Sequence, residues 1–465
     1  MLRATAGAAV VATGFGAVGS VSANEVATGQ TLYTRTLSGV HAFDAETGEE
    51  IWTAAEDSVS QSPPTVVDGV VYCGGSVINA LEAATGDEVW TSDPFGGGAF
   101  VSGPTVVNGM LYIGRATEIR PLYAIDAETG DEIWEFTGAD GRIDGAPHVV
   151  DGVVYVGSED GSLYALDADT GSLEWAFSET NGEAIYGSPS VIDDVVVFGT
   201  EARDLYAVDT GTGELSWSLS DDLIGNRASP TVADGQLYVG DDRFGMLSEG
   251  TLVALSSDGS ESWATDSGGA AVTVAGDFLY TRGYSSGIRA FDRSSGEQLW
   301  HVDTVGATPT LESIPAVVGD RLYTVSGEEG GDSIPITQLV ALDANSGEQQ
   351  WAVDDLGPDL GDGIDLTGQA MIASPTVVDD PDSGDSIDSR VLLGTDGHHD
   401  RVGFEHIQAP SGEGVPRDGT PAGDGAGGAD DGDDADDDGP GFGIAAAVAG
   451  VGGAAAVAAH LRKRD

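Results

Sequence analysis

The chain has 465 residues, of which 40% are hydrophobic and 70 are glycine, so it can build a large core and is not globally disordered. Acidic residues outnumber basic ones by 78 to 18, which gives a net charge of −60. Such a charge excludes a protein that binds nucleic acid by neutralising phosphates, and it disfavours adhesion to an anionic bilayer through basic patches. The single cysteine, Cys73, excludes an intrachain disulfide and a cysteine-based zinc site.

Residues 1–23 predict a secretory signal peptide. Arg3 precedes the small, apolar run Ala4–Val21, and Val21-Ser22-Ala23 is a small-x-small cleavage site, so we expect removal after Ala23. The segment Leu2–Thr5 resembles the part of a twin-arginine signal that follows its arginine pair, but the pair itself is not in this sequence. Export by the twin-arginine route and ordinary secretion both stay open.

Eight tryptophans recur through residues 24–410 at spacings of 37 to 51 residues. Each closes a copy of the pattern Ala-x-Asp-x-x-Thr-Gly-x-x-x-Trp, more or less complete, and the copy from Ala165 to Trp175 is among the clearest. A period of about 40 to 50 residues with strand patterning is typical of a β-propeller. We expect these tryptophans to be structural docking residues: Trp52, Trp90, Trp134, Trp175, Trp217, Trp263, Trp300 and Trp351.

Each full repeat predicts four strands. In the copy that ends at Trp175 they are His148–Val150, Val153–Val156, Leu163–Leu166 and the segment around Trp175. Asp151-Gly152 predicts a two-residue hairpin turn between the first two strands. Gly171 is expected to adopt a positive φ in the last turn, and the small Ala165 leaves room for an indole. The aspartate and threonine of the pattern can bond the backbone of that turn.

The first and last repeats complete each other. Residues 31–52 hold only the later strands of a repeat and lack its Ser-Pro-Thr-Val-Val opening, which returns at Ser374–Val378 with a following strand at Arg390–Gly394. Pairing these segments with the N-terminal strands closes a ring and removes exposed sheet edges. The sequence therefore predicts an all-β, eight-bladed β-propeller over residues 24–410.

The repeat resembles the pyrroloquinoline-quinone (PQQ)-type propeller repeat with its tryptophan docking motif, over residues 31 to about 407. This resemblance implies one of two classes: quinoprotein alcohol dehydrogenases, or non-catalytic propellers such as the assembly lipoprotein of bacterial outer membranes. The dehydrogenases use a vicinal disulfide, a carboxylate base and calcium, whereas Cys73 alone cannot supply adjacent cysteines and no matching catalytic segment is present. We therefore expect a non-catalytic binding or scaffolding module without a cofactor. A PQQ-dependent dehydrogenase with PQQ and calcium is the alternative.

The connections that precede the first strands are expected to form one mouth of the central channel and to hold its ligand, if there is one. Arg142 and Arg227 stand out there because cations are scarce in this chain. They can hold an anionic group of a ligand, or they can neutralise nearby acids. Tyr186 and Gln61 complete the candidate set. The same connections also contain Phe100, Asp144, Glu312 and Gln369.

Three other motifs give weaker evidence for a functional site. Asp379–Asp385 resembles a calcium loop but fails the EF-hand spacing, so a solvated insertion is favoured. His398-His399, with Asp396 and His406, suggests a metal site, yet adjacent histidines on a strand point to opposite faces. Cys73 is expected to be a small buried residue on a second strand. No P-loop fingerprint is present in the sequence.

The C-terminal part predicts a linker and an anchor. Residues 411–439 form a disordered acidic linker with seven aspartates between Asp430 and Asp438. In residues 440–465, Pro440, Gly441 and Phe442 open the tail, the uncharged run Gly441–Ala459 is about 28 Å long as a helix, and basic residues follow it. This order resembles the PGF-type C-terminal (PGF-CTERM) tail of archaeosortase substrates, which implies clipping and lipid attachment. A plain transmembrane helix is the alternative, and both place the propeller outside the membrane.

Most of the negative charge lies within residues 24–410, and the chain has only one lysine, Lys463. An Asp-rich, Lys-poor composition resembles proteins of salt-loving archaea, where a Debye length of about 3 Å at about 1 M salt screens the repulsion. We therefore expect a monomer anchored at the extracellular face of the membrane of a halophile. Its expected partner is an envelope protein or polysaccharide, and not nucleic acid.

Overall fold

The computed structural model divides the chain into two compact units, Met1–Ser411 and Gly412–Asp465, and all described residues belong to the first. The described residues are 7–8, 21–22, 30–36, 39–54, 63–92, 99–100, 102–116, 122–220, 229–240, 250–266, 268–269, 271–283, 287–302, 315–328, 336–353, 376–378, 393–396 and 400–403. The predicted linker and anchor, with Pro440, Gly441 and Phe442, lie outside them, as does the predicted cleavage residue Ala23.

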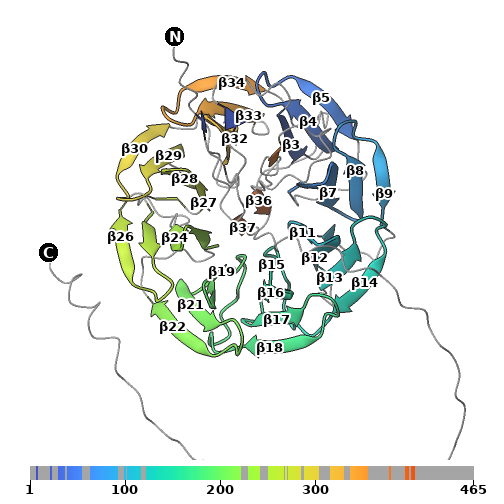
Figure 1. The fold of residues 1–465 in the computed structure, drawn as a ribbon, viewed down its shortest axis with the longest axis vertical. Helices are drawn as coiled ribbons and strands as arrows, with labels where there is room; N and C mark the ends of the chain where they lie inside the picture. The colour runs from blue at the N-terminus through green and yellow to red at the C-terminus, as the bar shows by residue number, and fades with distance from the viewer. Residues whose placement is uncertain are drawn as a thin grey trace, which may run out of the picture. The chain divides into compact units, whose positions relative to one another are not determined.

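Eight antiparallel sheets, which we number as blades 1 to 8, make up the propeller (Figure 1). Blade 1 contains β35 (Thr376–Val378), β3 (Thr31–Thr36), β4 (Gly39–Asp44) and β5 (Glu50–Ala54). Blade 2 contains β6 (Thr65–Val67), β7 (Val70–Gly74), β8 (Ile78–Glu82) and β9 (Glu88–Thr91). Blade 3 contains β11 (Thr105–Val107), β12 (Met110–Ala116), β13 (Leu122–Asp126) and β14 (Glu132–Phe136), with a fifth strand β10 (Ala99–Phe100) on β12.

The other blades repeat the same order. Blade 4 contains β15 (His148–Val150), β16 (Val153–Gly157), β17 (Leu163–Asp167) and β18 (Leu173–Phe177), and blade 5 contains β19 (Ser190–Ile192), β20 (Val195–Gly199), β21 (Asp204–Asp209) and β22 (Leu215–Ser220). Blade 6 contains β23 (Thr231–Ala233), β24 (Gln236–Gly240), β25 (Leu252–Leu255) and β26 (Glu261–Thr265). Blade 7 contains β27 (Ala271–Ala275), β28 (Phe278–Gly283), β29 (Gly287–Asp292) and β30 (Gln298–Val302), and blade 8 contains β31 (Ala316–Val318), β32 (Arg321–Glu328), β33 (Ile336–Asp343) and β34 (Gln349–Val353).

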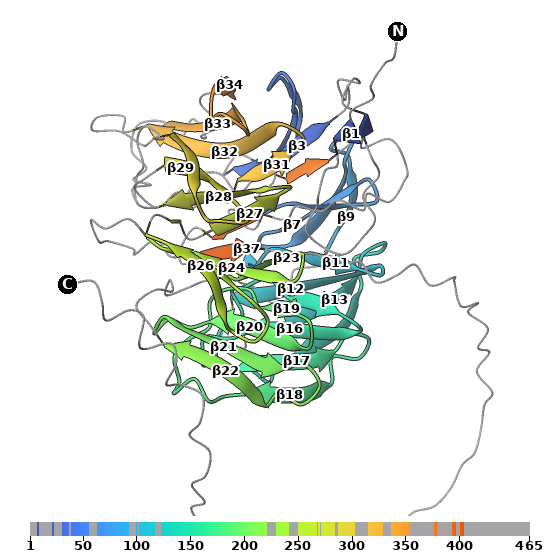
Figure 2. The same cartoon turned by 60° about the vertical axis from the view of Figure 1, so that its left-hand side comes forward.

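The first strands of the blades form a closed inner circuit. Each contacts its neighbour in the order β35, β6, β11, β15, β19, β23, β27, β31 and back to β35. In the turned view, blades 4 and 5 lie at one side of this ring and blades 1 and 8 at the other (Figure 2). The predicted eight-bladed all-β propeller is therefore confirmed, and no helix occurs in the described part of the chain.

The two ends of the propeller sequence share blade 1, as predicted. β35 pairs antiparallel with β3, and the register places Thr31 opposite Val378 and Tyr33 opposite Thr376. The expected place of Arg390–Gly394 in this blade is wrong. Residues 31–36 already supply the second strand of this blade beside β35, and β36 (Leu393–Asp396) pairs instead with β37 (Asp400–Gly403). Near the start of the chain, β1 (Gly7–Ala8) pairs with β2 (Val21–Ser22).

The predicted strands and turns of blade 4 occur where the sequence places them. Asp151 and Gly152 have φ values of 50° and 80°, the left-handed pair that a tight two-residue hairpin needs. Gly171 has φ 68°, and Asp167 Oδ1 accepts hydrogen bonds from the backbone and hydroxyl of Thr170 at 2.8 and 2.6 Å. The repeated turn residues therefore stabilise the turn between the third and fourth strands locally.

The hydrophobic core is divided among the contacts between neighbouring blades. One cluster joins Tyr112, Leu122 and Trp134 of blade 3 to Val154 and Leu166 of blade 4. The seven clusters found in the described residues each combine two adjacent blades in this way. A blade thus buries its two faces only when both neighbours are present.

Every tryptophan of the pattern contacts the following blade. Its indole Nε1 donates to a main-chain oxygen in the last turn of that blade, over 2.7 to 3.2 Å. The acceptors are Ala83 for Trp52, Ala127 for Trp90, Ala168 for Trp134, Thr210 for Trp175, Ser257 for Trp217, Arg293 for Trp263, Ala344 for Trp300 and Ala45 for Trp351. These contacts run once around the whole ring.

A β-bulge before each tryptophan directs it. In blade 4, Ala165 lies opposite Trp175 while the next residue, Leu166, lies opposite Leu173, so Glu174 is the extra residue. The same shift occurs in all eight blades. Bulges re-aim side chains and also twist an exposed edge away from pairing, so the outer strands are protected against edge-to-edge association.

Hydroxyl groups also link several pairs of neighbouring inner strands. Thr105 Oγ1, for example, donates over 2.7 Å to the main-chain oxygen of Pro147, the residue directly before β15. Five such bonds to the following blade are present among the described residues: those of Thr65, Thr105, Ser190, Thr231 and Thr273. We call them the inner hydroxyl contacts.

Candidate functional site at one mouth of the ring

Two sets of loops meet at the predicted mouth. The connection before β15 contacts the loop between β16 and β17, because Asp140 N donates to Asp160 Oδ2 over 2.8 Å and Glu159 N donates to the main-chain oxygen of Arg142 over 2.9 Å. Ile185 N, in the connection before β19, donates to the main-chain oxygen of Ser158. The mouth at blades 4 and 5 is therefore built from three interlocking loops.

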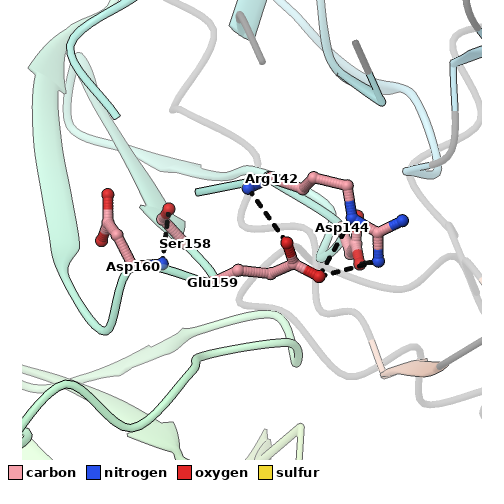
Figure 3. Close-up of polar contacts among 5 residues, drawn as sticks. All are labelled: Arg142, Asp144, Ser158, Glu159 and Asp160. Atoms are coloured by element: carbon pink, nitrogen blue, oxygen red, sulfur yellow. Dashed lines mark hydrogen bonds and ion pairs between the residues drawn. The ribbon is translucent and has the colours of Figure 1, made fainter. Parts of the chain in front are cut away.

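Arg142 lies at the centre of these loops between two carboxylates (Figure 3). Its Nη2 is 2.8 Å from Asp144 Oδ2 and 2.7 Å from Glu159 Oε1, and its Nε donates to Glu159 Oε1 over 3.0 Å. The Asp144 side chain is only 5% exposed, whereas that of Arg142 is 29% exposed. The guanidinium therefore compensates a buried carboxylate and a partly buried one.

The neighbouring Asp160 organises the loop between β16 and β17. It accepts hydrogen bonds from Tyr164 Oη over 2.9 Å and from Ser162 N over 2.8 Å. Burial acts to raise the pKa of Asp160, but the hydrogen bonds from Tyr164, Asp140 and Ser162 together hold it below its usual value. Burial raises the pKa of Tyr164 to about 12, so this phenol stays neutral and donates to the carboxylate.

The other mouth candidates have different positions. Tyr186 is half-buried in the connection before β19. Phe100 is fully buried, unlike a residue that lines an open mouth: it lies in β10, with Arg115 Cζ 4.9 Å from its ring centre. The remaining candidates, Gln61, Arg227, Glu312 and Gln369, lie outside the described residues.

Of the two interpretations of Arg142, its contacts favour neutralisation of nearby acids. Sequence spacing could not show this, because Glu159 reaches Arg142 from a separate loop 17 residues away. Sequence reasoning also missed four arginines that are buried in the blades: Arg35, Arg115, Arg282 and Arg289. Two of them, Arg35 and Arg282, occupy a position that is glycine in several other repeats, such as Gly74 and Gly114.

The remaining sequence motifs add no site within the described structure. No group of three or more metal-ligating side chains occurs among the described residues. The loop Asp379–Asp385 and the histidines 398, 399 and 406 lie outside that part, and Asp396 is placed only as the last residue of β36. Cys73 is fully buried on β7, the second strand of blade 2, as expected. In the portion of the chain that the structure describes, no helix is long and apolar enough to cross a membrane.

The sequence matches one protein-family model over nearly the whole propeller. The model is described as "Outer membrane protein assembly factor BamB", and it matches residues 4–76, 74–241, 187–266 and 248–395. The chain therefore belongs to this family of PQQ-like propeller proteins. None of the curated protein sequences compared with the chain matches it.

Solved structures share the fold at low sequence identity. BamB from Moraxella catarrhalis is 20% identical with a TM-score of 0.52, and the alignment covers 65% of this chain and 89% of BamB. Quinohemoprotein alcohol dehydrogenase from Comamonas testosteroni is 17% identical with a TM-score of 0.53, covering 72% of each chain. The quinohemoprotein alcohol dehydrogenase ADHIIG from Pseudomonas putida is also 17% identical, with a TM-score of 0.52 and coverage of 65% and 69%. Both classes expected from the repeat are therefore neighbours in fold, and the fold alone does not separate them.

Proposed function

We propose that this protein is a non-catalytic binding or scaffolding module at the cell surface of a halophile. One observation carries the choice over an enzyme: the only cysteine, Cys73, is fully buried in blade 2, so the vicinal disulfide expected of the quinoprotein dehydrogenases has no counterpart. The family description, an outer membrane protein assembly factor, supports a role in holding other proteins.

The mouth around Arg142 supports binding rather than bond-making chemistry. Its guanidinium is held by Asp144 and Glu159, and the pKa of the adjacent Asp160 is lowered, so this carboxyl is poorly suited to act as an acid near neutral pH. The trio instead forms a fixed ion-pair group in which Arg142 and Glu159 are partly exposed and Asp144 is buried. We infer that the partner, an envelope protein or polysaccharide, meets the ring at this mouth.

Capture of the partner from native envelope tests this function. The mature ring is immobilised at about 1 M salt, where surface repulsion is screened, and retained molecules are identified by mass spectrometry and sugar analysis. Tyr186→Ala alters the mouth, whereas Glu128→Ala alters an exposed turn between the last strands of blade 3 and is the matched control. A partner retained by Glu128→Ala but lost by Tyr186→Ala supports the proposal, and a ring that retains nothing specific contradicts it.

A PQQ-dependent dehydrogenase is the alternative, because two of the structural neighbours are quinohemoprotein alcohol dehydrogenases. Addition of PQQ and calcium followed by alcohols and a dye acceptor separates the two functions. A bound quinone spectrum together with dye reduction establishes the enzyme. We expect neither.

The location is part of the proposal. Export through the signal peptide and retention by the C-terminal tail would place the ring at the outer face of the membrane, as expected from residues 1–23 and 440–465. Mass spectrometry of the mature surface protein checks both ends. We expect a first residue of Asn24 and no peptide containing Arg462-Lys463, whereas recovery of that peptide would favour a plain transmembrane anchor.

A further inference from the structure

An inner hydroxyl contact is missing between blades 4 and 5. In the register of each blade, Thr65, Thr105, Ser190, Thr231 and Thr273 each lie opposite a second-strand residue, and His148 occupies the same place opposite Tyr155. The five hydroxyl residues donate to the following blade. His148 therefore stands where a hydroxyl would bond to the main chain before β19.

His148 does not replace the missing bond. Its Nε2 is buried without a hydrogen-bond partner among the described residues, and the residue is only 5% exposed. Ser188 Oγ, two residues before β19, is a second buried polar atom without a partner at this contact. The outer part of the same contact is also long, since Tyr155 Oη is 3.5 Å from Thr210 O, whereas the equivalent Tyr112 Oη is 3.1 Å from Ala168 O.

The surroundings of His148 carry no charge that could stabilise an imidazolium. Its paired strand β16 and the flanking inner strands β11 and β19 contain no acidic or basic residue. The titratable group on these strands is Tyr155, and burial raises its pKa to about 12, so it stays neutral. Asp144 and Asp151 are the nearest charged residues along the chain, four positions before and three after. Burial alone lowers the pKa of His148 to about 4.

We propose that the contact between blades 4 and 5 is an acid-sensitive seam of the ring, which opens when the buried imidazole of His148 takes up a proton from solvent. An opened seam exposes His148 to water, where the imidazole binds a proton readily, and so acid stabilises the open state. This inference concerns a conformational device and does not depend on the proposed function.

Opening of this seam would reach the candidate mouth. Gly145, next to Asp144, lies so close to the adjoining loop that an added Cβ would be 2.6 Å from Gly187 O. The Arg142–Asp144 pair is therefore on one side of the seam and Tyr186 with Ser188 on the other. Acid would separate residues that the closed ring holds together.

Ala316 provides an internal comparison. It occupies the same register position in blade 8, opposite Tyr323, and also lacks a hydroxyl. Alanine has no proton to gain, so the contact between blades 8 and 1 lacks one hydrogen bond without becoming sensitive to pH through this position. The proposed property thus depends on the imidazole and not only on the missing bond.

Amide hydrogen exchange of the intact protein at about 1 M salt tests the proposal, with protection factors corrected for intrinsic exchange. Between about pH 7.5 and about pH 5, the opening constant of β15 and β19 should rise about 30-fold, as expected for a group whose pKa moves from about 6.5 to about 4. The protection of β23 and β27, which meet at the hydroxyl of Thr231, should change far less.

Two variants test whether the imidazole of His148 causes the acid sensitivity of β15 and β19. His148→Thr supplies the residue type found at most of the inner hydroxyl contacts and should remove the excess acid sensitivity of β15 and β19. Thr105→His places an imidazole at the contact between blades 3 and 4 and should create a second sensitive seam at β11 and β15. If β15 and β19 lose the same protection in His148→Thr as in the natural protein, or if the natural protein shows no loss there, the proposal is wrong.

Discussion

Trp351 Nε1 donates a hydrogen bond to the main-chain oxygen of Ala45 over 3.2 Å, although 306 positions separate the two residues in the chain. The bond is equivalent to the one that Trp134 makes with Ala168 between consecutive repeats. Blade 8 therefore contacts blade 1 as each earlier blade contacts its successor. Tyr323 Oη donates to the same Ala45 oxygen over 3.0 Å, so the closing contact has two side-chain donors.

The turn glycine beneath each indole gives the first prediction. Gly152 and Gly171 both have positive φ, but an added Cβ meets nothing within 4 Å at Gly152, whereas at Gly171 it would lie 2.6 Å from the Trp134 ring. Gly152→Ala should cost only the backbone strain, about 1 kcal/mol. Gly171→Ala should cost about 2 to 4 kcal/mol because it also displaces the indole. Denaturant unfolding of both variants measures the difference, and equal costs would contradict the indole contact.

The Arg142 cluster gives the second prediction. Arg142→Ala removes the cation beside the buried Asp144 carboxylate and should cost about 1 to 3 kcal/mol of unfolding free energy. Glu159→Gln keeps the Arg142–Asp144 pair and should cost less than about 1 kcal/mol, because Glu159 is more exposed. The two costs are compared by denaturant unfolding. A larger loss for Glu159→Gln would show that Asp144 does not depend on Arg142.

Net charge gives the third prediction. With −60 at neutral pH, self-repulsion should destabilise the ring at low ionic strength, and about 1 M salt should screen it. The melting temperature is therefore expected to fall steadily as sodium chloride is removed. A melting temperature that stays constant on desalting would contradict a halophilic adaptation.

The fourth prediction concerns global stability and pH. The pKa of His148 is lowered in the folded state, so between pH 6.5 and about 4 the unfolded chain binds a proton that the folded chain does not. Stability from this residue is thus complete above pH 6.5 and is lost as pH falls below it. At about pH 5 the loss should be about 2 kcal/mol relative to His148→Thr. The unfolding free energies of the natural protein and of His148→Thr are measured above pH 6.5 and at about pH 5. Contributions from carboxyl groups are the same in both proteins and cancel in the difference.

Much of the fold was predictable because the same turn and tryptophan residues recur at equivalent positions in eight repeats. The Asp151-Gly152 turn, the positive φ of Gly171 and the shared blade 1 each follow from residue types at fixed positions. Periodicity could not assign Arg390–Gly394, because a strand-like segment near a free end has no repeat to compare with. It also could not show which blade Trp175 contacts, since the direction depends on the bulge at Glu174.

The candidate site was less predictable, for physical reasons. Arg142 was identified from the scarcity of cations, but the contact with Glu159 arises only when blade 4 folds, because Glu159 lies on the separate loop between β16 and β17. Phe100 precedes an inner strand like the other mouth candidates. It is nevertheless part of β10, the fifth strand of blade 3, where it lies opposite Arg115. His148 differs from its counterparts by one side chain within an otherwise regular strand, and only its unpartnered Nε2 distinguishes it.

A disulfide across the closing pair tests the central claim, the eight-bladed ring joined by β3 and β35, most directly. Thr31 and Val378 are opposite each other in the register, and the Cα separation of such antiparallel partners, about 4.5 to 5.5 Å, suits a disulfide. Both test proteins carry Cys73→Ala. The pair Thr31→Cys and Val378→Cys should form a disulfide readily when the protein is folded at high salt. The control pair, Thr31→Cys and Thr231→Cys in blade 6, should not. Rapid bridging of the first pair alone is the expected result, and a rate no faster than in the denatured chain would contradict the closure of the ring.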